Sequence, residues 1–314
     1  MKVLITGGAG FIGSNFVDRL MAAGHEVCVF DNLSSGSREH VRHHLDDGKF
    51  RFVQADVLDL PALKEAMASG VALVIHTCSN PDIAKGMTQP DLDLHQGIVA
   101  TFNVLEAMRL TGVKKIIFLS GSGVYGDVGE TFTDENFSPL LPISMYGASK
   151  LAAEALISAL CHMFDMQGWI FRLANIVGHR QTHGVIFDFV RKLRRNPREL
   201  DILGDGTQSK SYLHVSDVID GILFVFGKTE NRINIYNVST NDFATVTEIA
   251  DIVVREMKLA GVAYRYTGGD RGWKGDVPVV RIDTTKINRL GWKPRHSTAQ
   301  AVELAIRENI ESCK

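Results

Sequence analysis

Lys2-Val-Leu-Ile-Thr-Gly7-Gly-Ala-Gly10-Phe-Ile-Gly13 is the stretch that decides the fold. Its apolar start, Lys2–Thr6, predicts a buried strand, and Gly13–Ala23 predicts a helix that ends at Gly24. The three glycines between them allow a tight turn, close approach of the backbone to a phosphate, and close packing of helix on strand. A pyrophosphate would lie at the helix N-terminus, where unpaired N–H groups and the helix dipole favour an anion. The stretch therefore predicts a dinucleotide-binding strand–turn–helix unit.

The pattern continues outward from this unit as alternating strands and helices. Further strands are predicted at Glu26–Phe30, Phe50–Gln54, Val71–His76 and Lys115–Ser120, with helices at Pro61–Ala68 and Ile98–Leu110. This alternation indicates right-handed crossovers and a parallel sheet. From Asn175 the rhythm becomes irregular. We predict an α/β fold: a Rossmann-type doubly wound parallel sheet over residues 1–174, and a smaller C-terminal α+β lobe over 175–314, some of whose segments can return to the first domain.

Composition narrows the function classes. The 314 residues are 45% hydrophobic and 22% charged, and 34 Lys and Arg against 36 Asp and Glu give a formal charge of −2. This balance argues against nucleic-acid binding, and no apolar run reaches the length of a membrane span. Glycines interrupt the first apolar stretch after five residues, so no signal peptide is expected. The cysteines (Cys28, Cys78, Cys161 and Cys313) form no CxxC pair. We expect a cytoplasmic protein without a metal site.

An acidic residue follows the second predicted strand at the position that a dinucleotide fold uses. Asp31 lies 18 residues after Gly13, where a carboxylate accepts hydrogen bonds from the adenosine ribose hydroxyls. It would also repel a 2′-phosphate, so NAD is favoured over NADP. Asp56, after the third strand, either starts a loop or accepts a bond from the adenine amino group.

A second motif suggests chemistry. Tyr146-Gly-Ala-Ser-Lys150 opens a predicted helix that runs through Leu160, and residues four apart share a helix face. A tyrosine with an ordinary pKa near 10 is a poor base at neutral pH. The Lys150 cation and the positive nicotinamide ring favour phenolate, and lowering the pKa by roughly three units requires about 4 kcal/mol. YxxxK alone is a weak motif, but together with GxxGxxG it predicts a dehydrogenase-type base.

These motifs and several landmarks resemble the extended short-chain dehydrogenases/reductases of the NAD-dependent epimerase/dehydratase family, most of all the UDP-glucose 4-epimerases. The landmarks occur in the family's order, nearly from end to end: Thr6–Ser14, Asp31–Gly36, Val124–Gly126, Tyr146–Lys150, Gly204–Gln208, Tyr212–Val218 and Leu290–Pro294. The resemblance implies a doubly wound sheet that holds NAD tightly and a C-terminal lobe that holds a nucleoside diphosphate sugar.

Carried over position by position, the resemblance assigns roles. Tyr146 would be the base that takes the sugar hydroxyl proton, and Lys150 would hold the nicotinamide ribose. NAD-contacting positions would be Gly7, Gly10, Phe11, Ile12, Asp31, Asn32, Ser35, Gly36, Asp56, Val57, Tyr146 and Lys150. Substrate positions would be Ser122, Asn175, Lys210, Arg271 and Asp276. Tyr212 and His214 are expected to be structural, packing the lobes together.

Several positions depart from the family pattern. Lys210 stands where an Arg is usual, so it supplies charge without a bidentate fork. Arg271 lies further than usual from the following Gly-Asp pair, and Gly97 replaces an Asn near the start of the mid-chain helix. Gly121 falls on the family's third catalytic position, usually Ser or Thr. Ser122 is the better replacement for that hydroxyl, with Ser120 as the other candidate.

The residues beside Gly121 also discriminate between family activities. Sugar-nucleotide 4,6-dehydratases carry Asp-Glu where this chain has Ser122-Gly123, and UDP-glucuronate decarboxylases carry a Glu in the same turn. We therefore expect a UDP-sugar epimerase, first of all a UDP-glucose/UDP-galactose 4-epimerase acting through a 4-keto intermediate. A UDP-glucuronate epimerase, with Arg180 or His183 near the sugar C6, or a UDP-N-acetylhexosamine epimerase is the alternative. A non-catalytic NAD-binding protein is the rival from another class.

The resemblance also implies a homodimer. Family members usually dimerise through the tyrosine-bearing helix and the one before it, here about residues 147–163 and 96–110. Their apolar residues suit either a dimer bundle or burial against the sheet, and we favour the dimer. They are Ile98, Val99, Phe102, Leu105, Leu151, Leu156, Ile157 and Leu160.

Overall fold

The computed structural model describes residues 1–312, so Cys313 lies outside the described part. It divides into two compact units that interleave along the chain. The first comprises Met1–Val124, Met145–Arg172 and Phe226–Tyr236, and the second comprises Tyr125–Ser144, Leu173–Val225 and Asn237–Lys314. The sequence predicts a boundary after residue 174, with some later segments returning to the first domain. In the structure, residues 226–236 group with the first unit and residues 125–144 with the second.

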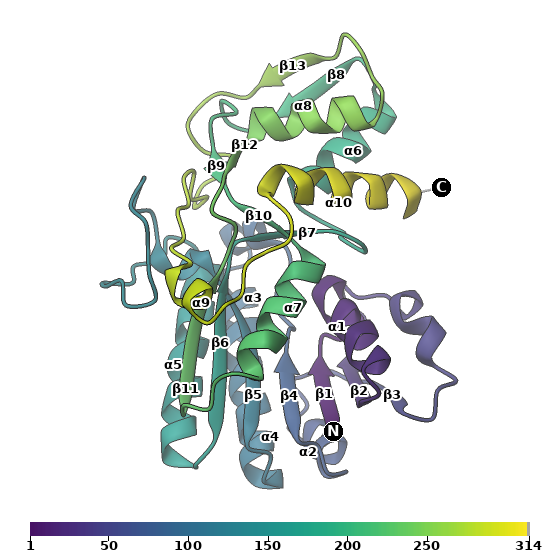
Figure 1. Cartoon of the computed structure of the whole chain (residues 1–314), viewed down its shortest axis with the longest axis vertical. Helices are drawn as coiled ribbons and strands as arrows, with labels where there is room; N and C mark the ends of the chain where they lie inside the picture. The colour runs from purple at the N-terminus through teal and green to yellow at the C-terminus, as the bar shows by residue number, and fades with distance from the viewer. Residues whose placement is uncertain (313–314) are drawn as a thin grey trace. The chain divides into compact units, whose positions relative to one another are not determined.

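The first unit contains a seven-stranded sheet with the order β11-β6-β5-β4-β1-β2-β3, which Figure 1 shows from β11 at one edge to β3 at the other. Its strands are β1 (Lys2–Thr6), β2 (Glu26–Asp31), β3 (Phe50–Gln54), β4 (Leu73–His76), β5 (Lys115–Gly121), β6 (Gln167–Leu173) and β11 (Ile233–Val238). The pairs β3–β2, β2–β1, β1–β4 and β4–β5 are parallel. The order reverses at β1, as in a doubly wound nucleotide-binding sheet.

Helical segments connect these strands. They are α1 (Phe11–Ala22), the 3-10 helix η1 (Arg38–His44), α2 (Leu60–Met67), the 3-10 helix η2 (Ile83–Met87), α3 (Pro90–Asp93), the π-helical turn η3 (Leu94–Val99), α4 (Ala100–Thr111) and α5 (Met145–Met163). The predicted helix at 98–110 is therefore preceded by a π-helical turn, a rare element that often marks a functional site. The predicted strands of the first 120 residues all form, each within two residues of its expected ends.

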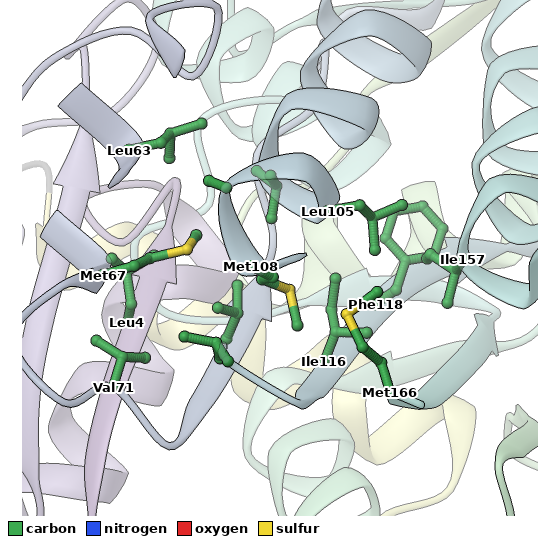
Figure 2. Packing of buried hydrophobic residues seen from close by; sticks show 14 of the residues in the cluster. Leu4, Leu63, Met67, Val71, Leu105, Met108, Ile116, Phe118, Ile157 and Met166 are labelled. Carbon is green, nitrogen blue, oxygen red and sulfur yellow. The ribbon is translucent and has the colours of Figure 1, made fainter. Parts of the chain in front are cut away.

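The core of this unit lies between one face of the sheet and the helices α2, α4 and α5. Leu4, Ile116 and Phe118 come from strands, and Figure 2 shows them packed against Met67 and Leu105 from the helices. Along β1, residues of both orientations are fully buried. Burial on both faces explains why the strands read as continuous apolar runs rather than as alternating ones.

The second unit is built from helices and short strand pairs. Its helices are α6 (Val185–Arg195), α7 (Val215–Phe226), α8 (Val246–Glu256), α9 (Thr285–Arg289) and α10 (Thr298–Ser312). Its strand pairs are β7 (Asn175–Val177) with β10 (Tyr212–His214), β9 (Ser209–Lys210) with β12 (Ala244–Thr245), and β8 (Glu199–Ile202) with β13 (Ala263–Tyr266). Buried residues of α6, α8 and α10 form a separate core. The short 3-10 segment η4 (Ser122–Tyr125) begins in the first unit and ends in the second. None of the helices in residues 1–312 is both long enough and apolar enough to cross a membrane.

Candidate active site

Several predicted cofactor residues and the candidate catalytic Ser122 lie at the carboxyl edge of the parallel sheet. Gly7 follows β1, Asp31 ends β2, Asp56 follows β3, and Ser122 follows β5. Parallel strands present all their carboxyl ends at one edge, and ligands of open α/β sheets bind there, beside the point where strand order reverses. The fold thus brings residues more than 100 positions apart in the sequence to one edge.

The glycine turn fits a bound anion because side chains are excluded from it. Gly7 has a φ of +70°, and a Cβ there would lie 2.8 Å from the Cys78 backbone nitrogen. A Cβ on Gly13 would lie 2.1 Å from the Gly7 carbonyl oxygen, so helix and turn pack backbone to backbone. Gly10 is the N-cap of α1, with no side-chain cap and no acidic residue in the first turn. The first-turn N–H groups, those of Phe11 and Ile12 included, have no intrahelical partner and point toward the place of the predicted pyrophosphate.

Asp31 supports this turn through both of its carboxylate oxygens. One of its carboxylate oxygens accepts a hydrogen bond from the Ala9 N–H at 2.9 Å, and the other accepts one from the Leu33 N–H at 2.8 Å. Burial raises the pKa of the Asp31 carboxyl, and the two backbone hydrogen bonds act in the opposite direction. Asp31 therefore ties β2 to the glycine turn in addition to offering its remaining lone pairs.

The rest of the predicted cofactor group forms a loop around this carboxylate. The Asn32 side-chain amide donates to Asp56 at 2.8 Å, linking the segments after β2 and β3. Gly36 packs so closely on the turn that a Cβ there would lie 2.8 Å from the Ala9 carbonyl carbon. Ser35 is exposed and Val57 is half-buried. All the predicted cofactor positions thus fall in the first unit.

Tyr146 and Lys150 occupy the first turns of α5, as the motif predicts. The Lys150 ammonium lies 5.4 Å from the centre of the Tyr146 ring and donates a hydrogen bond to the Leu119 carbonyl oxygen at 2.8 Å. Lys150 is buried, and burial lowers the pKa of its ammonium to about 8, opposed by the charges of Cys78, Asp93 and Glu154. The lysine is thus a fixed, poorly solvated cation beside the phenol.

The electrostatics of Tyr146 differ from the sequence-based expectation. In the protein alone the pKa of its phenol is raised to about 12, first by burial and second by the Asp93 carboxylate, while a hydrogen bond with Ser79 acts in the opposite direction. Burial of the phenol and the nearby carboxylate therefore shift this pKa in the direction opposite to the lowering expected from Lys150. The positive nicotinamide ring of bound NAD⁺ would favour the phenolate.

Asp93 is a feature of this site that the sequence analysis missed. It is buried at the end of α3, directly before the π-helical turn, and accepts a hydrogen bond from the Asn80 amide at 3.2 Å. Its second carboxylate oxygen is buried without a hydrogen-bond partner in the described residues. Burial raises the pKa of this carboxyl. One sequence signal was available: Asp93 lies seven residues before the buried Ala100, in the register of a helix's inner face.

The two candidate serines beside Gly121 have different environments. The Ser120 hydroxyl is buried and donates to the Glu154 carboxylate at 2.6 Å. That carboxylate also pairs with Arg172 at 2.7 Å, with both side chains almost fully buried. The Ser122 side chain is half-buried and makes no hydrogen bond within residues 1–312. Ser120 thus belongs to a buried ion-pair network, whereas Ser122 has a hydroxyl available for a ligand.

Gly97 lies in the π-helical turn, and its lack of a side chain has a structural reason. A Cβ there would lie 2.5 Å from the Ser149 hydroxyl oxygen. The Ser149 hydroxyl donates to the Tyr146 carbonyl oxygen at 2.8 Å. Ser149 therefore occupies the space that the family's usual Asn would need.

The predicted phosphate-binding residues come together within the second unit. The Lys210 ammonium contacts one Asp276 carboxylate oxygen at 2.6 Å, and the Arg271 guanidinium donates to the Asp276 backbone carbonyl at 2.7 Å. Arg271 also pairs with Asp127. Lys210 and Arg271 are therefore both held beside Asp276. Their spacing in the sequence does not predict this placement.

Asn175 has a partner that the sequence did not suggest. Its side chain hydrogen-bonds to the hydroxyl of Tyr212, whose pKa is raised by burial. The parallel pairing of β7 with β10 places these two residues opposite each other. His214, also buried, contacts Ser216 at 2.8 Å and Glu308 at 3.1 Å. Tyr212 and His214 are thus packed within their own unit; their expected role between lobes stays a prediction.

Comparison with known proteins agrees with this arrangement. Residues 3–239 match the NAD dependent epimerase/dehydratase family. A UDP-glucose 4-epimerase of Mycolicibacterium smegmatis is 32% identical, covering 98% of this chain and 97% of its own. A solved UDP-galactose 4-epimerase is 36% identical with a TM-score of 0.89, and both chains are fully covered. A UDP-glucose 4-epimerase of Thermotoga maritima, solved with UDP-glucose, is 30% identical with a TM-score of 0.91 over the full length of both. The family match spans well over half of the residues. The sheet, the glycine turn and the Tyr–Lys pair also lie where the family's motifs require. The chain therefore belongs to the NAD-dependent epimerase/dehydratase family.

Proposed function

We propose that this protein is an NAD-dependent epimerase of a UDP-sugar that interconverts UDP-glucose and UDP-galactose through a transient 4-keto sugar. The observation that carries the proposal is the Tyr146–Lys150 pair on α5, in the same compact unit as the glycine turn and Asp31. An epimerase needs one reversible proton carrier and one tightly held cofactor, and this unit provides residues for both.

The residues of the first unit fit NAD. The glycine turn excludes side chains from the pyrophosphate position, and Asp31 offers a buried carboxylate to the ribose hydroxyls while disfavouring a 2′-phosphate. Asn32 and Asp56 would hold the adenosine end, and Lys150 the nicotinamide ribose. When bound, NAD takes up and returns the hydride of the sugar carbon.

Tyr146 is the proposed base and acid. Its phenolate oxygen takes the proton of the sugar C4 hydroxyl and returns it to the opposite epimer. Lys150 stabilises the phenolate as a fixed cation, whose charge is held in place by the Leu119 carbonyl. We propose that Ser122 donates a hydrogen bond to the same sugar oxygen, since its hydroxyl is uncommitted and Ser120 is engaged by Glu154.

We assign the diphosphate to the cationic residues of the second unit. Lys210 and Arg271 converge on the segment around Asp276 and would bind the two phosphates, with Asp276 fixing the lysine and Asn175 contributing its amide. Their present carboxylate partners keep both cations oriented before a ligand arrives. Because Lys210 and Arg271 both contact Asp276, their two positive charges lie at one place, where they can bind one diphosphate.

Two alternative activities differ from this one in the sugar. The alternatives are a 4-epimerase of UDP-glucuronate or of a UDP-N-acetylhexosamine. In the loop after β7, Arg180 has a φ of +68° and His183 is exposed. A cation there would favour a C6 carboxylate. A non-catalytic NAD-binding protein remains the rival from a different class.

The test is product identity. The purified protein, supplied with NAD, is incubated separately with UDP-glucose, UDP-N-acetylglucosamine and UDP-glucuronate, and the products are separated by anion-exchange chromatography. We expect UDP-galactose from UDP-glucose at the highest kcat/KM. Faster conversion of either other substrate would select an alternative sugar, and no conversion of any would favour the non-catalytic protein.

We further propose that the protein is a homodimer that pairs through α4 and α5. Support comes from exposed apolar side chains: Phe102 and Leu110 on α4, Met163 on α5, and Val99 at the end of η3 directly before α4. In contrast, Leu105 and Ile157 from the same predicted face are buried in the unit's own core. Phe102→Glu should convert a dimer to a monomer in sedimentation velocity, and a wild-type monomer would refute the proposal.

We also propose a cytoplasmic location. The three cysteines within the described residues, Cys28, Cys78 and Cys161, are free thiols. Free thiols are typical of a reducing compartment. Fractionation of the source cells with an antibody to the protein tests this proposal.

A further inference from the structure

A cluster of three polar side chains lies outside the residues discussed so far, where η1 meets α1. Asp18 comes from α1, and His43 and His44 are the last two residues of η1. The Nε2 atoms of both histidines lie 2.8 Å from the same Asp18 carboxylate oxygen. The three donor atoms all lie within 4.8 Å of one another.

The convergence of the two rings is unusual for neighbouring residues. In a 3-10 helix successive side chains are about 120° apart around the axis, since one turn takes about three residues. The His43 and His44 rings nevertheless have centres 4.0 Å apart, at an interplanar angle of 44°. Hydrogen bonding to one carboxylate oxygen needs only one imidazole, so a second ring aimed at the same oxygen calls for another explanation.

We propose that Asp18, His43 and His44 form a binding site for a divalent transition-metal ion of the Zn²⁺ type. Two imidazole nitrogens and one carboxylate oxygen are a donor set that suits Zn²⁺, which takes such ligands at about 2.0–2.2 Å. Ligand atoms around a tetrahedral ion at that distance lie about 3.3 Å apart. The two N···O separations of 2.8 Å therefore need to widen by only a few tenths of an ångström.

The exposure of the cluster fits a surface site with one open position. The His43 side chain is 52% exposed, that of His44 15% and that of Asp18 35%. The ion can therefore enter from solvent and keep water as its remaining ligand. Each imidazole must present an unprotonated Nε2, so the metal replaces the hydrogens that now bridge to Asp18.

The position of the cluster suggests what a bound ion does. Earlier in η1, the His40 ring nitrogen contacts the Ala9 carbonyl oxygen at 2.9 Å, and the Ser37 N–H donates to the same oxygen at 3.0 Å. The segment that leads into η1 is Asp31–Gly36, which carries the predicted ribose contacts. An ion that joins the end of η1 to α1 would hold this segment against the glycine turn from its far end.

The cysteine spacing predicts no metal site, and no short motif marks this cluster. His43 and His44 are adjacent in the chain, but their carboxylate partner is 25 residues earlier on a different helix. Only the return of η1 onto α1 brings the three together.

The test is metal binding to the whole protein after treatment with EDTA and gel filtration. Zn²⁺ affinity is measured by calorimetry, and Co²⁺ is used as a spectroscopic probe whose visible absorption reports its coordination. Variants Asp18→Asn, His43→Ala and His44→Ala remove one ligand each. His162→Ala, which removes an exposed imidazole with no carboxylate beside it, is the matched control.

We expect one Zn²⁺ per chain, bound at least tenfold more weakly by each ligand variant and unchanged in the control. Zn²⁺ should also raise the melting temperature of the wild type and of His162→Ala but not of the ligand variants, a readout independent of catalysis. Equal Zn²⁺ affinity in the wild type and the three ligand variants, or no binding at all, would overturn the proposal and leave the cluster as a pair of hydrogen bonds.

Discussion

Ser122 and Ser120 should respond to alanine substitution in opposite ways. Ser122→Ala removes a half-buried hydroxyl that makes no hydrogen bond within residues 1–312, so the fold loses little. Ser120→Ala removes a donor at 2.6 Å from the buried Glu154 carboxylate. We therefore expect Ser122→Ala to lower activity at unchanged stability, and Ser120→Ala to lower stability with a smaller effect on activity.

The magnitudes follow from the two environments. A positioned hydrogen bond to a charged group contributes about 1.5–3 kcal/mol. At about 1.36 kcal/mol per factor of ten in rate, its loss slows epimerisation by roughly ten- to a hundredfold. In Ser120→Ala, Arg172 still pairs with Glu154, so only one of the carboxylate's donors is lost. That loss costs about 1–3 kcal/mol of the free energy of unfolding.

The assay pairs kcat/KM for UDP-galactose, followed by product formation, with urea unfolding of each variant. The double variant serves as a control, because it should show both the activity loss of Ser122→Ala and the stability loss of Ser120→Ala. If Ser122→Ala turned over every UDP-sugar tested at the wild-type rate while Ser120→Ala lost activity at full stability, Ser120 would be the missing hydroxyl and our reasoning would be wrong.

Substitutions at three further positions test other parts of the site. Asp31→Ala should weaken NAD binding and relax discrimination against NADP in cofactor titrations. It should also lower stability, because the Ala9 and Leu33 N–H groups lose their acceptor. Asp31→Asn retains an acceptor oxygen, so it should relax discrimination at a smaller cost in stability. Asp93→Asn should lower the pKa of the Tyr146 phenol, since it removes the carboxylate that raises this pKa. Because a base acts when deprotonated, the rising limb of kcat/KM against pH should move to lower pH. An unmoved limb would show that Asp93 does not influence the phenol. Gly121→Thr should be tolerated or activating on UDP-galactose if Gly121 is a lost hydroxyl position, whereas loss of activity on an N-acetylated or C6-oxidised sugar alone would show that Gly121 makes space for that substituent.

Much of the first unit could be predicted because its signals are local. The glycine turn, the apolar strand runs and the Tyr146–Lys150 spacing each depend on residues close together in the chain, and the alternation of strands and helices then implies a parallel sheet with right-handed crossovers. The predicted and observed strands at Lys2–Thr6 and Phe50–Gln54 coincide. The predictions for the turn glycines and Asp31 come from the same local patterns, whereas those for most other cofactor positions come from the family resemblance.

The remaining features depend on contacts between distant residues. Asp93 becomes important only because packing buries it and brings its charge to Tyr146, and no short motif marks it. The return of residues 226–236 to the first unit adds β11 to the sheet next to β6, an edge addition that periodicity cannot place. The engagement of Ser120 by Glu154, 34 residues later, likewise needed the structure.

The measurement that tests the central claim most directly compares wild type with Tyr146→Phe in the conversion of UDP-glucose to UDP-galactose, with the bound NAD content of both proteins determined in parallel. The substitution removes one hydroxyl and leaves the ring in place. We predict a loss in kcat of at least about a hundredfold, the low end for a general base, with NAD content unchanged. Near-wild-type turnover by Tyr146→Phe, with full NAD content, would contradict the assignment of Tyr146 as the proton carrier of this epimerase.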